Sequence, residues 1–405
     1  MDLQNKNKET SIKWNKDAIY ALGLYRWLSS ILGIWPSENR IFSKIRIGTF
    51  IILQLTTVCI FIERIIVSGN CGTIQEIVDT IVVSISSTQI SLKCLLICFQ
   101  HQKFKRIISS ALEDWSNIID KPSKRIMIKF GYIGRVLFTC QVMTGVATAI
   151  PLIMSELPKL KEVPNENNSS IILLRTIPLA PSCWVSITMS SYLYYSYWTS
   201  VALYIFCVSM ATVSCNLFVY GLGLHVFVQF ELLYLSLDTV FDNQSHFQQK
   251  KFFKKFVQRH DKILEIANDL EDASTGVILS EVAAIIVVGC VAGVMLLLAQ
   301  HEGDSETVSA MVVRLVLVFI QLYIYSYMGE KLSAQADKIQ DAIYNCPWYA
   351  FSPLVAKDLK FIMIRSNYPF YITAGKFLPM NLMSFKAVVK SMFSFFSVLR
   401  LMLQD

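Results

Sequence analysis

The stretch VAAIIVVGCVAGVMLLLA, residues 282–299, decides the class of fold. It contains no Asp, Glu, Lys or Arg. A helix that crosses a bilayer needs about 20 mostly apolar residues, because the hydrocarbon layer is about 30 Å thick. We therefore predict that this stretch is a transmembrane helix.

Further apolar runs lie on both sides of it. The chain of 405 residues is 54% hydrophobic and only 17% charged, which is far from the composition of a soluble domain. The uncharged stretch 176–230 is too long for one crossing, so we expect its first part to be a partly apolar loop. Together with 282–299, seven spans are predicted, the other six being 47–62, 72–100, 136–155, 192–230, 308–329 and 381–402.

The distribution of cations predicts the orientation, because Lys and Arg accumulate on the cytoplasmic side. Four segments hold 27 of them: the residues before the first span, Lys103–Lys129, Lys250–Lys262 and Lys331–Lys376. The alternate loops hold only 4. The amino terminus is therefore predicted inside and, after seven crossings, the carboxyl terminus outside. The net charge of +7 is mostly this bias and requires no nucleic acid.

The second outside loop carries two overlapping glycosylation acceptors, Asn167 and Asn168. Their outside placement agrees with the orientation. Most of the ten cysteines lie in spans or cytoplasmic segments, and only Cys71 and Cys183 share the oxidising side. A disulfide between these two and a pair of free thiols both remain open, with free thiols favoured.

Two cytoplasmic segments have helical periodicity. Residues 250–275 place Phe and Leu on one face and Lys and Asp on the other, and residues 331–346 continue the sixth span as a helix that Pro347 ends. A short helix opened by Ser352 and Pro353 should follow. We expect a helical bundle below the membrane, either a solvated linker or, as we favour, a subunit contact.

The segment before the first span is also partly apolar. Residues 18–32 contain Arg26, and no small-residue cleavage motif follows them, so a signal peptide is disfavoured. We expect an amphipathic segment at the inner interface, with Trp14, Trp27 and Trp35 as interfacial anchors.

Motifs for catalysis or for metal and cofactor binding are not found in the sequence, so we expect neither an enzyme nor a cofactor. Glu271 and Asp272, the adjacent carboxylates of the cytoplasmic helix, are expected to face water. A G-protein-coupled receptor has its amino terminus outside, opposite to the orientation predicted here, and this chain also lacks that class's motifs after the third span and in the last. We therefore expect no G protein as a partner.

The closing third resembles the insect odorant receptor family. The matching segments are RHDKILEIANDLED (259–272), GEKLSAQADKIQDAIYNCPWY (329–349) and IMIRSNYPFYITAGKFLPMNLMSFKAVVKSMFSFFSVLR (362–400). The family's middle Tyr of the terminal motif is Phe395 here. The amino-terminal GLYRWLSSILGIWP (23–36) is similar to the family's start, whereas the central spans match only in topology and length.

This resemblance implies a ligand-gated, non-selective cation channel. It would be a heterotetramer of odorant-tuned and co-receptor subunits, placed in the plasma membrane of olfactory neuron dendrites, and its ligand would be a small hydrophobic odorant. The family's co-receptor has a longer loop between the fourth and fifth spans, so this chain looks like an odorant-tuned subunit.

The resulting fold class is all-α. We expect a polytopic membrane protein with seven transmembrane helices, a cytoplasmic amino terminus and a cytoplasmic helical anchor bundle. The expected domains are 1–46 as the amino-terminal segment, 47–330 as six spans with a cytoplasmic extension at 231–275, 331–380 as anchor helices and 381–405 as the pore helix.

In the resembling family the last helix lines the pore. Ser394, Val398 and Met402 lie four residues apart and share one helix face, and Val398 falls at the family's hydrophobic gate. Packing against neighbouring helices is the alternative role for Val398. On this reading Lys386 and Lys390 lie in the cytoplasmic half, facing a vestibule or reaching toward the interface.

The resemblance also places a ligand pocket among the second, third, fourth and sixth spans, in their outer halves. Arg314 is the cation deep in the outer half, and Asp79 is the expected partner by depth. Ordinary helix packing remains the alternative for each pocket residue. The pocket residues expected from topology are Ile81, Ser84, Thr88, Thr144, Ala147, Pro151, Tyr195, Trp198, Ala202, Val313 and Leu317.

Two alternatives remain. A gustatory-receptor-like channel shares the topology but typically ends in a Thr-Tyr-x-x-x-x-Gln-Phe pattern that is absent here. A transporter is disfavoured because the spans show no internal repeat.

Overall fold

The structure is a computed structural model of the whole chain, and its description covers the larger part of the residues. The described residues are 14–36, 40–68, 73–118, 120–154, 157–158, 160–164, 171–179, 181, 184, 189–238, 246–346, 348–351, 353–366 and 370–402.

Helices dominate these residues, and two small antiparallel hairpins interrupt them. Strand β1 (Leu160–Pro164) pairs with β2 (Ile171–Arg175), and β3 (Thr373–Ala374) pairs with β4 (Leu378–Pro379). The helices are α1 (Lys16–Leu32), α2 (Arg40–Ser68), α3 (Ile74–Phe99), α4 (His101–Asn117), α5 (Lys121–Met154), α6 (Ser191–Asp238), α7 (His246–Glu302), α8 (Ser305–Asn345), α9 (Pro353–Ser366), α10 (Leu382–Met402) and the 3₁₀ turn η3 (Trp348–Ala350).

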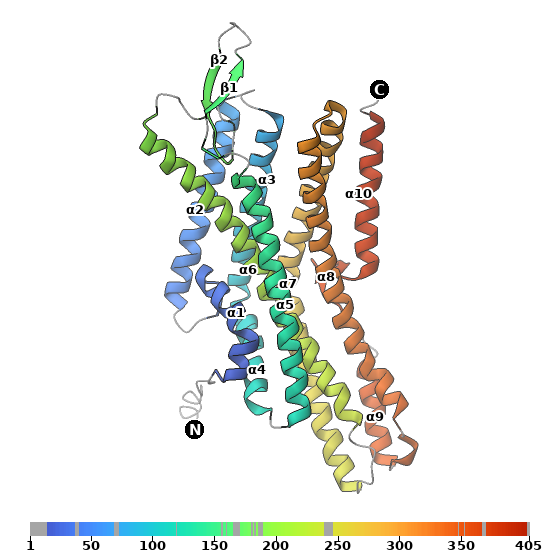
Figure 1. Cartoon of the computed structure of the whole chain (residues 1–405). Helices are drawn as coiled ribbons and strands as arrows, with labels where there is room; N and C mark the ends of the chain where they lie inside the picture. The colour runs from blue at the N-terminus through green and yellow to red at the C-terminus, as the bar shows by residue number, and fades with distance from the viewer. Residues whose placement is uncertain are drawn as a thin grey trace.

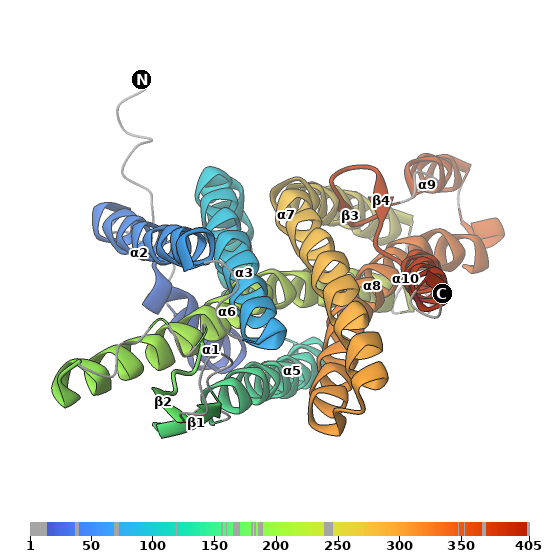
Figure 2. The ribbon, with the colours of Figure 1, turned by 90° about the horizontal axis from the view of Figure 1, so that it is seen from above.

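The helices form an elongated bundle around α6. Seen from above, α6 runs across the middle, with α3 on one side and α5 on the other, and α10 lies at the edge beside α8 (Figure 2). Helix α1 lies in the lower half of the bundle, whereas α10 ends at the opposite end, where the β1–β2 hairpin lies (Figure 1). This arrangement fits an odd number of crossings.

Within the described residues, six helices are long and apolar enough to cross a membrane: α2, α3, α5, α6, α7 and α8. Helix α10 is the seventh span, which runs for 21 residues beside α7 and α8. The seven-helix fold of a multi-pass membrane protein is therefore as the hydropathy pattern predicted.

The observed helices are much longer than the predicted spans. Helix α7 has 57 residues and joins the predicted cytoplasmic helix to the fifth span without a break, and α8 has 41 residues and extends below the sixth. The start of α7, the end of α8 and α9 form the lower bundle (Figure 1). Phe253 packs there on Phe351, with ring centroids 5.6 Å apart.

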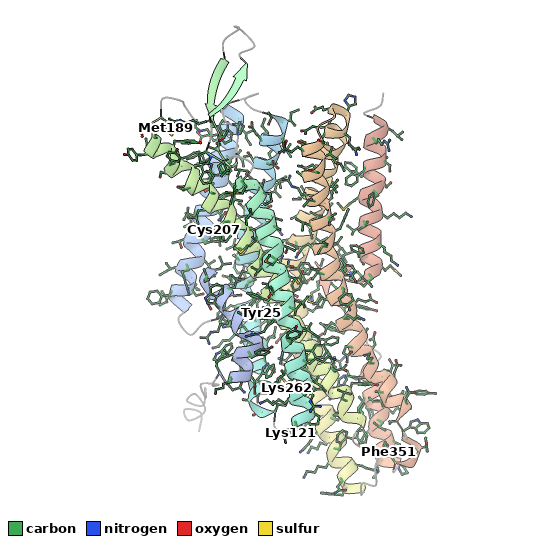
Figure 3. The ribbon with its side chains drawn as sticks, viewed as in Figure 1. Tyr25, Lys121, Met189, Cys207, Lys262 and Phe351 are labelled. Atoms are coloured by element: carbon green, nitrogen blue, oxygen red, sulfur yellow. The ribbon has the colours of Figure 1, made fainter. Side chains whose placement is uncertain are left out.

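Two cations of the predicted cytoplasmic segments lie at this lower end. Lys121 and Lys262, together with Phe351, lie below Tyr25, and Met189 of the predicted outside loop lies at the other end of the molecule (Figure 3). For these residues the two ends separate as predicted. A membrane-spanning bundle needs this separation because charges are costly in hydrocarbon.

The first helix packs against protein more than the sequence suggested. The Tyr25 hydroxyl donates a hydrogen bond to the carbonyl of Gly134 on α5, over 2.6 Å. Trp35 is buried against Phe218 of α6, so its predicted role as an interfacial anchor is wrong. Trp27 is exposed, as an interfacial anchor would be. Helix α1 is thus bound to the bundle through one face.

The β3–β4 hairpin, which precedes α10, is bound to α7. The backbone N–H of Gly375 donates to the Thr275 carbonyl over 3.1 Å, and the Lys376 side chain pairs with Glu271 and Asp272. The hairpin covers Glu271, which is buried, so the expectation that this carboxylate faces water is wrong. Asp272 remains exposed on the helix surface.

The second predicted outside loop contains the β1–β2 hairpin, which was not predicted from the sequence. Asn167, Asn168, Cys71 and Cys183 fall outside the described residues. Within the described part of the chain, the eight cysteines are free thiols.

Candidate functional site

A large cavity lies between α3, α5, α6, α7 and α8, with a volume of about 690 Å³. This is within the range of small-molecule pockets, which enclose about 300–1,000 Å³. Its lining is mostly apolar, contributed among others by Ile205, Val208, Ile285, Val288 and Leu317.

Helix α3 forms one wall with a stripe at helical spacing. Val82, Ser86 and Gln89 of this stripe face the cavity, whereas Ser87 and Ser91 are buried in helix contacts. Of the other polar residues in this part of α3, Ser84 is also buried, whereas Thr88 is exposed. Most of their hydroxyls donate to carbonyls four residues earlier in the same helix, as Ser86 does to Val82 over 2.9 Å.

The floor of the cavity is a buried polar network centred on Glu281 of α7. Its carboxylate pairs with Lys93 of α3 and accepts a hydrogen bond from the amide of Asn216 on α6 over 3.2 Å. Lys93 Nζ also donates to Asn216 Oδ1 over 2.7 Å, and Tyr325 of α8 donates to the same oxygen over 3.0 Å. Gln89 donates to the Glu281 carboxylate as well. Four helices thus meet at this charge pair.

A second link at the floor joins α5 to α8. The Gln141 amide donates to Gln321 Oε1 over 2.6 Å, and Gln321 donates to the Tyr220 hydroxyl over 3.1 Å. Both glutamines line the cavity. The amides place neutral hydrogen-bonding groups beside the charged network.

An ion pair lies in the wall at the other end. Arg314 of α8 donates to Asp79 Oδ1 of α3 over 2.7 Å, which is the pairing predicted from depth. Both residues line the cavity, together with Gln75, Glu306 and Ser309. A guanidinium has five N–H donors. Arg314 directs one to Asp79 and another, at 3.9 Å, to the sulfur of Met311.

Helix α5 contributes a backbone acceptor. Pro151 lies inside this helix and has no N–H, so the carbonyl of Ala147 loses its usual partner four residues ahead. Both residues line the cavity. Helix α5 therefore has, at a residue that lines the cavity, a carbonyl oxygen that lacks its helical donor.

Five of the eleven predicted pocket residues line this cavity: Thr144, Ala147, Pro151, Val313 and Leu317. On α3 the residues that line the cavity lie on a different side of the helix from the predicted residues. On α6 the lining begins at Ile205, deeper than the predicted positions. The other six predicted residues, which are not among the lining residues, are Ile81, Ser84, Thr88, Tyr195, Trp198 and Ala202.

Sequence reasoning missed the floor of the cavity. Lys93 was visible as a charge within a span, which is a signal of function or of a partner. Glu281 lies one residue before the uncharged run that defines the fifth span. Because that position resembles a span boundary, the sequence did not indicate that Glu281 is buried.

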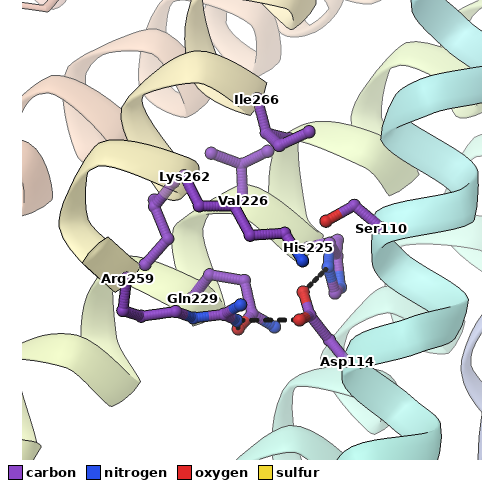
Figure 4. Close-up of a pocket in the computed structure, with 9 residues that line it drawn as sticks. Ser110, Asp114, His225, Val226, Gln229, Arg259, Lys262 and Ile266 are labelled. Atoms are coloured by element: carbon purple, nitrogen blue, oxygen red, sulfur yellow. Dashed lines mark hydrogen bonds and ion pairs between the residues drawn. The ribbon is translucent and has the colours of Figure 1, made fainter. Parts of the chain in front are cut away.

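The small second pocket, about 10 Å³, lies at the lower end and has room for little more than a water molecule. Asp114 of α4 faces His225 of α6 at 3.2 Å and Arg259 of α7 at 2.9 Å (Figure 4). Burial alone would raise the pKa of Asp114, but His225 and Arg259 hold this pKa below its ordinary value. The cluster connects three helices and leaves no space for an odorant-sized ligand.

Helix α10 presents an unpacked face. Lys386, Lys390, Ser394 and Val398 are spaced four apart and exposed, with Val398 at 54%. The opposite face contacts α7, where Phe396 lies so close to Gly293 that a Cβ would clash with its ring. The side chain of Met402 falls outside the described residues.

Comparisons with known proteins agree with this architecture. A family model described as 7tm Odorant receptor matches residues 73–393. Odorant receptor 2a of Drosophila melanogaster is 28% identical over 116 residues, 27% of this chain and 29% of that protein. Odorant receptor 13a of the same organism is 25% identical over 163 residues, 38% and 39% of the two chains. The match spans well under half the length of these curated relatives.

Solved structures match over nearly the whole chain. The insect olfactory receptor OR5 from Machilis hrabei superposes with a TM-score of 0.73 at 15% identity, covering 94% of this chain and 99% of that one. The same receptor in complex with eugenol gives a TM-score of 0.71 at 14% identity, covering 96% and 100%. At these identities the likeness establishes a shared fold.

Proposed function

Because this chain belongs to the 7tm odorant receptor family, we propose that it binds a small, mostly apolar odorant and opens a cation channel together with a co-receptor subunit. The site of action would be the plasma membrane. A family of receptors also agrees with the lack of catalytic motifs in the sequence.

The observation that carries the proposal is the cavity of about 690 Å³. An odorant-sized molecule needs apolar surface over most of its area and a few oriented polar groups. The cavity offers both, with apolar walls between the Arg314–Asp79 pair at one end and, at the other, the glutamine amides and the Glu281 network. A receptor of the same fold has been solved in complex with eugenol, which supports a small-molecule ligand for this cavity.

The exposed stripe of α10 supports the channel part of the proposal. In a single chain this helix contacts α7 and α8 and leaves Lys386, Lys390, Ser394 and Val398 uncovered. In a tetramer, four such faces would surround a central pore, with Val398 forming an apolar constriction that excludes ions by dewetting. The polar members of the stripe would face water.

Co-expression with a co-receptor tests the proposal. Cells receive this chain, the co-receptor or both, and whole-cell currents are recorded while a panel of volatiles is applied. We expect cation currents that require both chains and depend on the volatile. Currents identical with the co-receptor alone would contradict the proposal, and uptake of labelled compound by this chain alone would favour a transporter.

Val398→Ala tests the pore assignment in the same cells. Enlarging an apolar constriction should change the relative permeability to large organic cations. Val67→Ala, the same change at an exposed valine of α2, away from α10, is the matched control. Equal permeability ratios in wild type and Val398→Ala would place the constriction elsewhere.

A further inference from the structure

The Arg314–Asp79 ion pair in the cavity wall differs from an ordinary structural pair, because Arg314 has N–H donors that the pair does not use. Arg314 and Asp79 both line the cavity. Of the five N–H groups of Arg314, one meets Asp79 and one makes a long contact to the Met311 sulfur. The guanidinium therefore retains donor capacity next to an apolar space.

The charges around Arg314 select the kind of acceptor. Asp79 already neutralises the guanidinium, and Glu306 lies in the same part of the lining. An anionic ligand would approach two carboxylates, which disfavours it. A neutral carbonyl oxygen can accept from the guanidinium without this repulsion.

From this geometry we infer that Arg314 is a specificity-determining residue that donates a hydrogen bond to the carbonyl of a neutral ligand, such as a ketone, aldehyde or ester with a long apolar body. The inference rests on the proposed function, since it takes the cavity as the odorant site. The apolar body lies against the walls formed by Val313 and Leu317 of α8 and Ala147 of α5.

The Ala147 carbonyl would recognise a different kind of ligand from the one that Arg314 would recognise. Pro151 deprives it of its helical donor, so a ligand hydroxyl could donate to it. The two groups call for different ligands: Arg314 selects an acceptor, and Ala147 selects a donor. A series of 2-alkanones, with 2-alkanols and n-alkanes of the same number of non-hydrogen atoms, separates them.

The test uses cells that express this chain with the co-receptor. A buried ion pair replaced on both sides by apolar residues of similar size is often tolerated, so Asp79→Leu/Arg314→Met is the variant of choice. We expect wild type to respond to the 2-alkanone at a concentration about tenfold or more below that for the n-alkane, because a hydrogen bond to a charged group is lost in the alkane. In the double variant this preference should disappear while the alkane response remains.

Controls separate this role from a structural one. Val313→Ala, next to Arg314, should shift the responses to alkanone and alkane alike, and surface labelling verifies that both variants reach the membrane. Equal responses to alkanone and alkane in wild type, or an unchanged preference in the double variant, would overturn the inference. So would a stronger response to the alkanol that the double variant retains, since that pattern assigns recognition to Ala147.

The failures of the two proposals are distinguishable. Co-receptor-dependent currents evoked by other volatiles, but by no alkanone, leave the proposed function standing and overturn the inference. The absence of any co-receptor-dependent current contradicts the proposed function, and the inference fails with it.

Discussion

The cavity has an ion pair at each end, and the two differ in burial. At the floor, the side chains of Lys93 and Glu281 are 0% and 5% exposed. In the wall near the other end, those of Arg314 and Asp79 are 20% and 16% exposed. Desolvation of a charge is costly, so the floor pair depends on its surroundings much more than the wall pair does.

The two ion pairs also differ in the number of hydrogen bonds that surround them. The floor pair has Asn216 and Gln89 as additional partners, and both Glu281 oxygens accept hydrogen bonds. The wall pair is joined by a single strong hydrogen bond. A satisfied pair is suited to holding helices together, whereas a pair with unused donors is suited to meeting a ligand.

Removing the cation at the floor should have the largest effect. Lys93→Met leaves a buried carboxylate without its counter-ion, which costs about 3–5 kcal/mol in comparable sites. We expect little folded receptor at the cell surface, measured by surface labelling and by thermal melting of purified protein. Lys93→Met/Glu281→Leu, which removes both charges, should recover much of the loss. If Lys93→Met alone were as stable as wild type, the pair would be unimportant for folding.

The wall pair should be more tolerant. Exchanging one charge, in Asp79→Arg or Arg314→Asp, places two like charges together and should lower stability by about 1–3 kcal/mol. The double exchange Asp79→Arg/Arg314→Asp restores the attraction and should recover surface expression. Failure of the double exchange to improve on either single variant would remove this pairing.

His260 is a buried ionisable group in the lower bundle, where the neighbouring Asp261 only partly offsets the effect of burial on its pKa. Burial, followed by the positive charge of Arg365, lowers the pKa of His260 from 6.5 to about 4. As the pH falls from about 6.5, the unfolded chain binds a proton that the folded chain excludes, so stability decreases. The loss should reach up to about 2 kcal/mol at pH 5.

Thermal melting at pH 7 and pH 5 checks this effect, with His260→Leu as the variant. Leucine cannot bind a proton, so the melting temperature of the variant should depend less on pH than that of wild type. An identical pH dependence in both proteins would show that His260 does not carry it.

The smallest effect is expected for an exposed pair. The side chains of Lys262 and Glu113, 2.7 Å apart, are 39% and 50% exposed. Solvent and salt screen such a pair, so Glu113→Gln should change stability by less than about 1 kcal/mol. Melting in low and high salt measures it. A loss comparable with that in Lys93→Met would contradict the ranking by burial.

Which side of α3 faces the cavity could not be predicted from the sequence. Ser84, Ser86, Thr88 and Ser91 each donate to a carbonyl four residues earlier, so the helix itself satisfies these hydroxyls. A hydroxyl satisfied in this way can face lipid, protein or a cavity at similar cost. The hydroxyls of this helix therefore did not indicate which of its residues face the cavity.

The depth of the cavity along α6 was equally undetermined. Tyr195 is exposed near the start of this helix, and the lining begins at Ile205. Over 48 residues α6 is apolar on all sides, so no periodicity distinguishes one face or depth from another. On α5 and α8 the predicted positions are among the residues that line the cavity.

By itself the sequence determined which segments cross the membrane, which way they run and that Arg314 should meet Asp79. Each of these follows from a requirement that the bilayer imposes on a segment: enough apolar length, cations inside and no isolated charge in the hydrocarbon. Only the tertiary structure decided that Lys93 meets Glu281, 188 residues away, and that a cavity lies above them. Hydropathy records how a helix meets lipid, whereas helix neighbours and the space between them depend on side-chain packing among segments far apart in the chain.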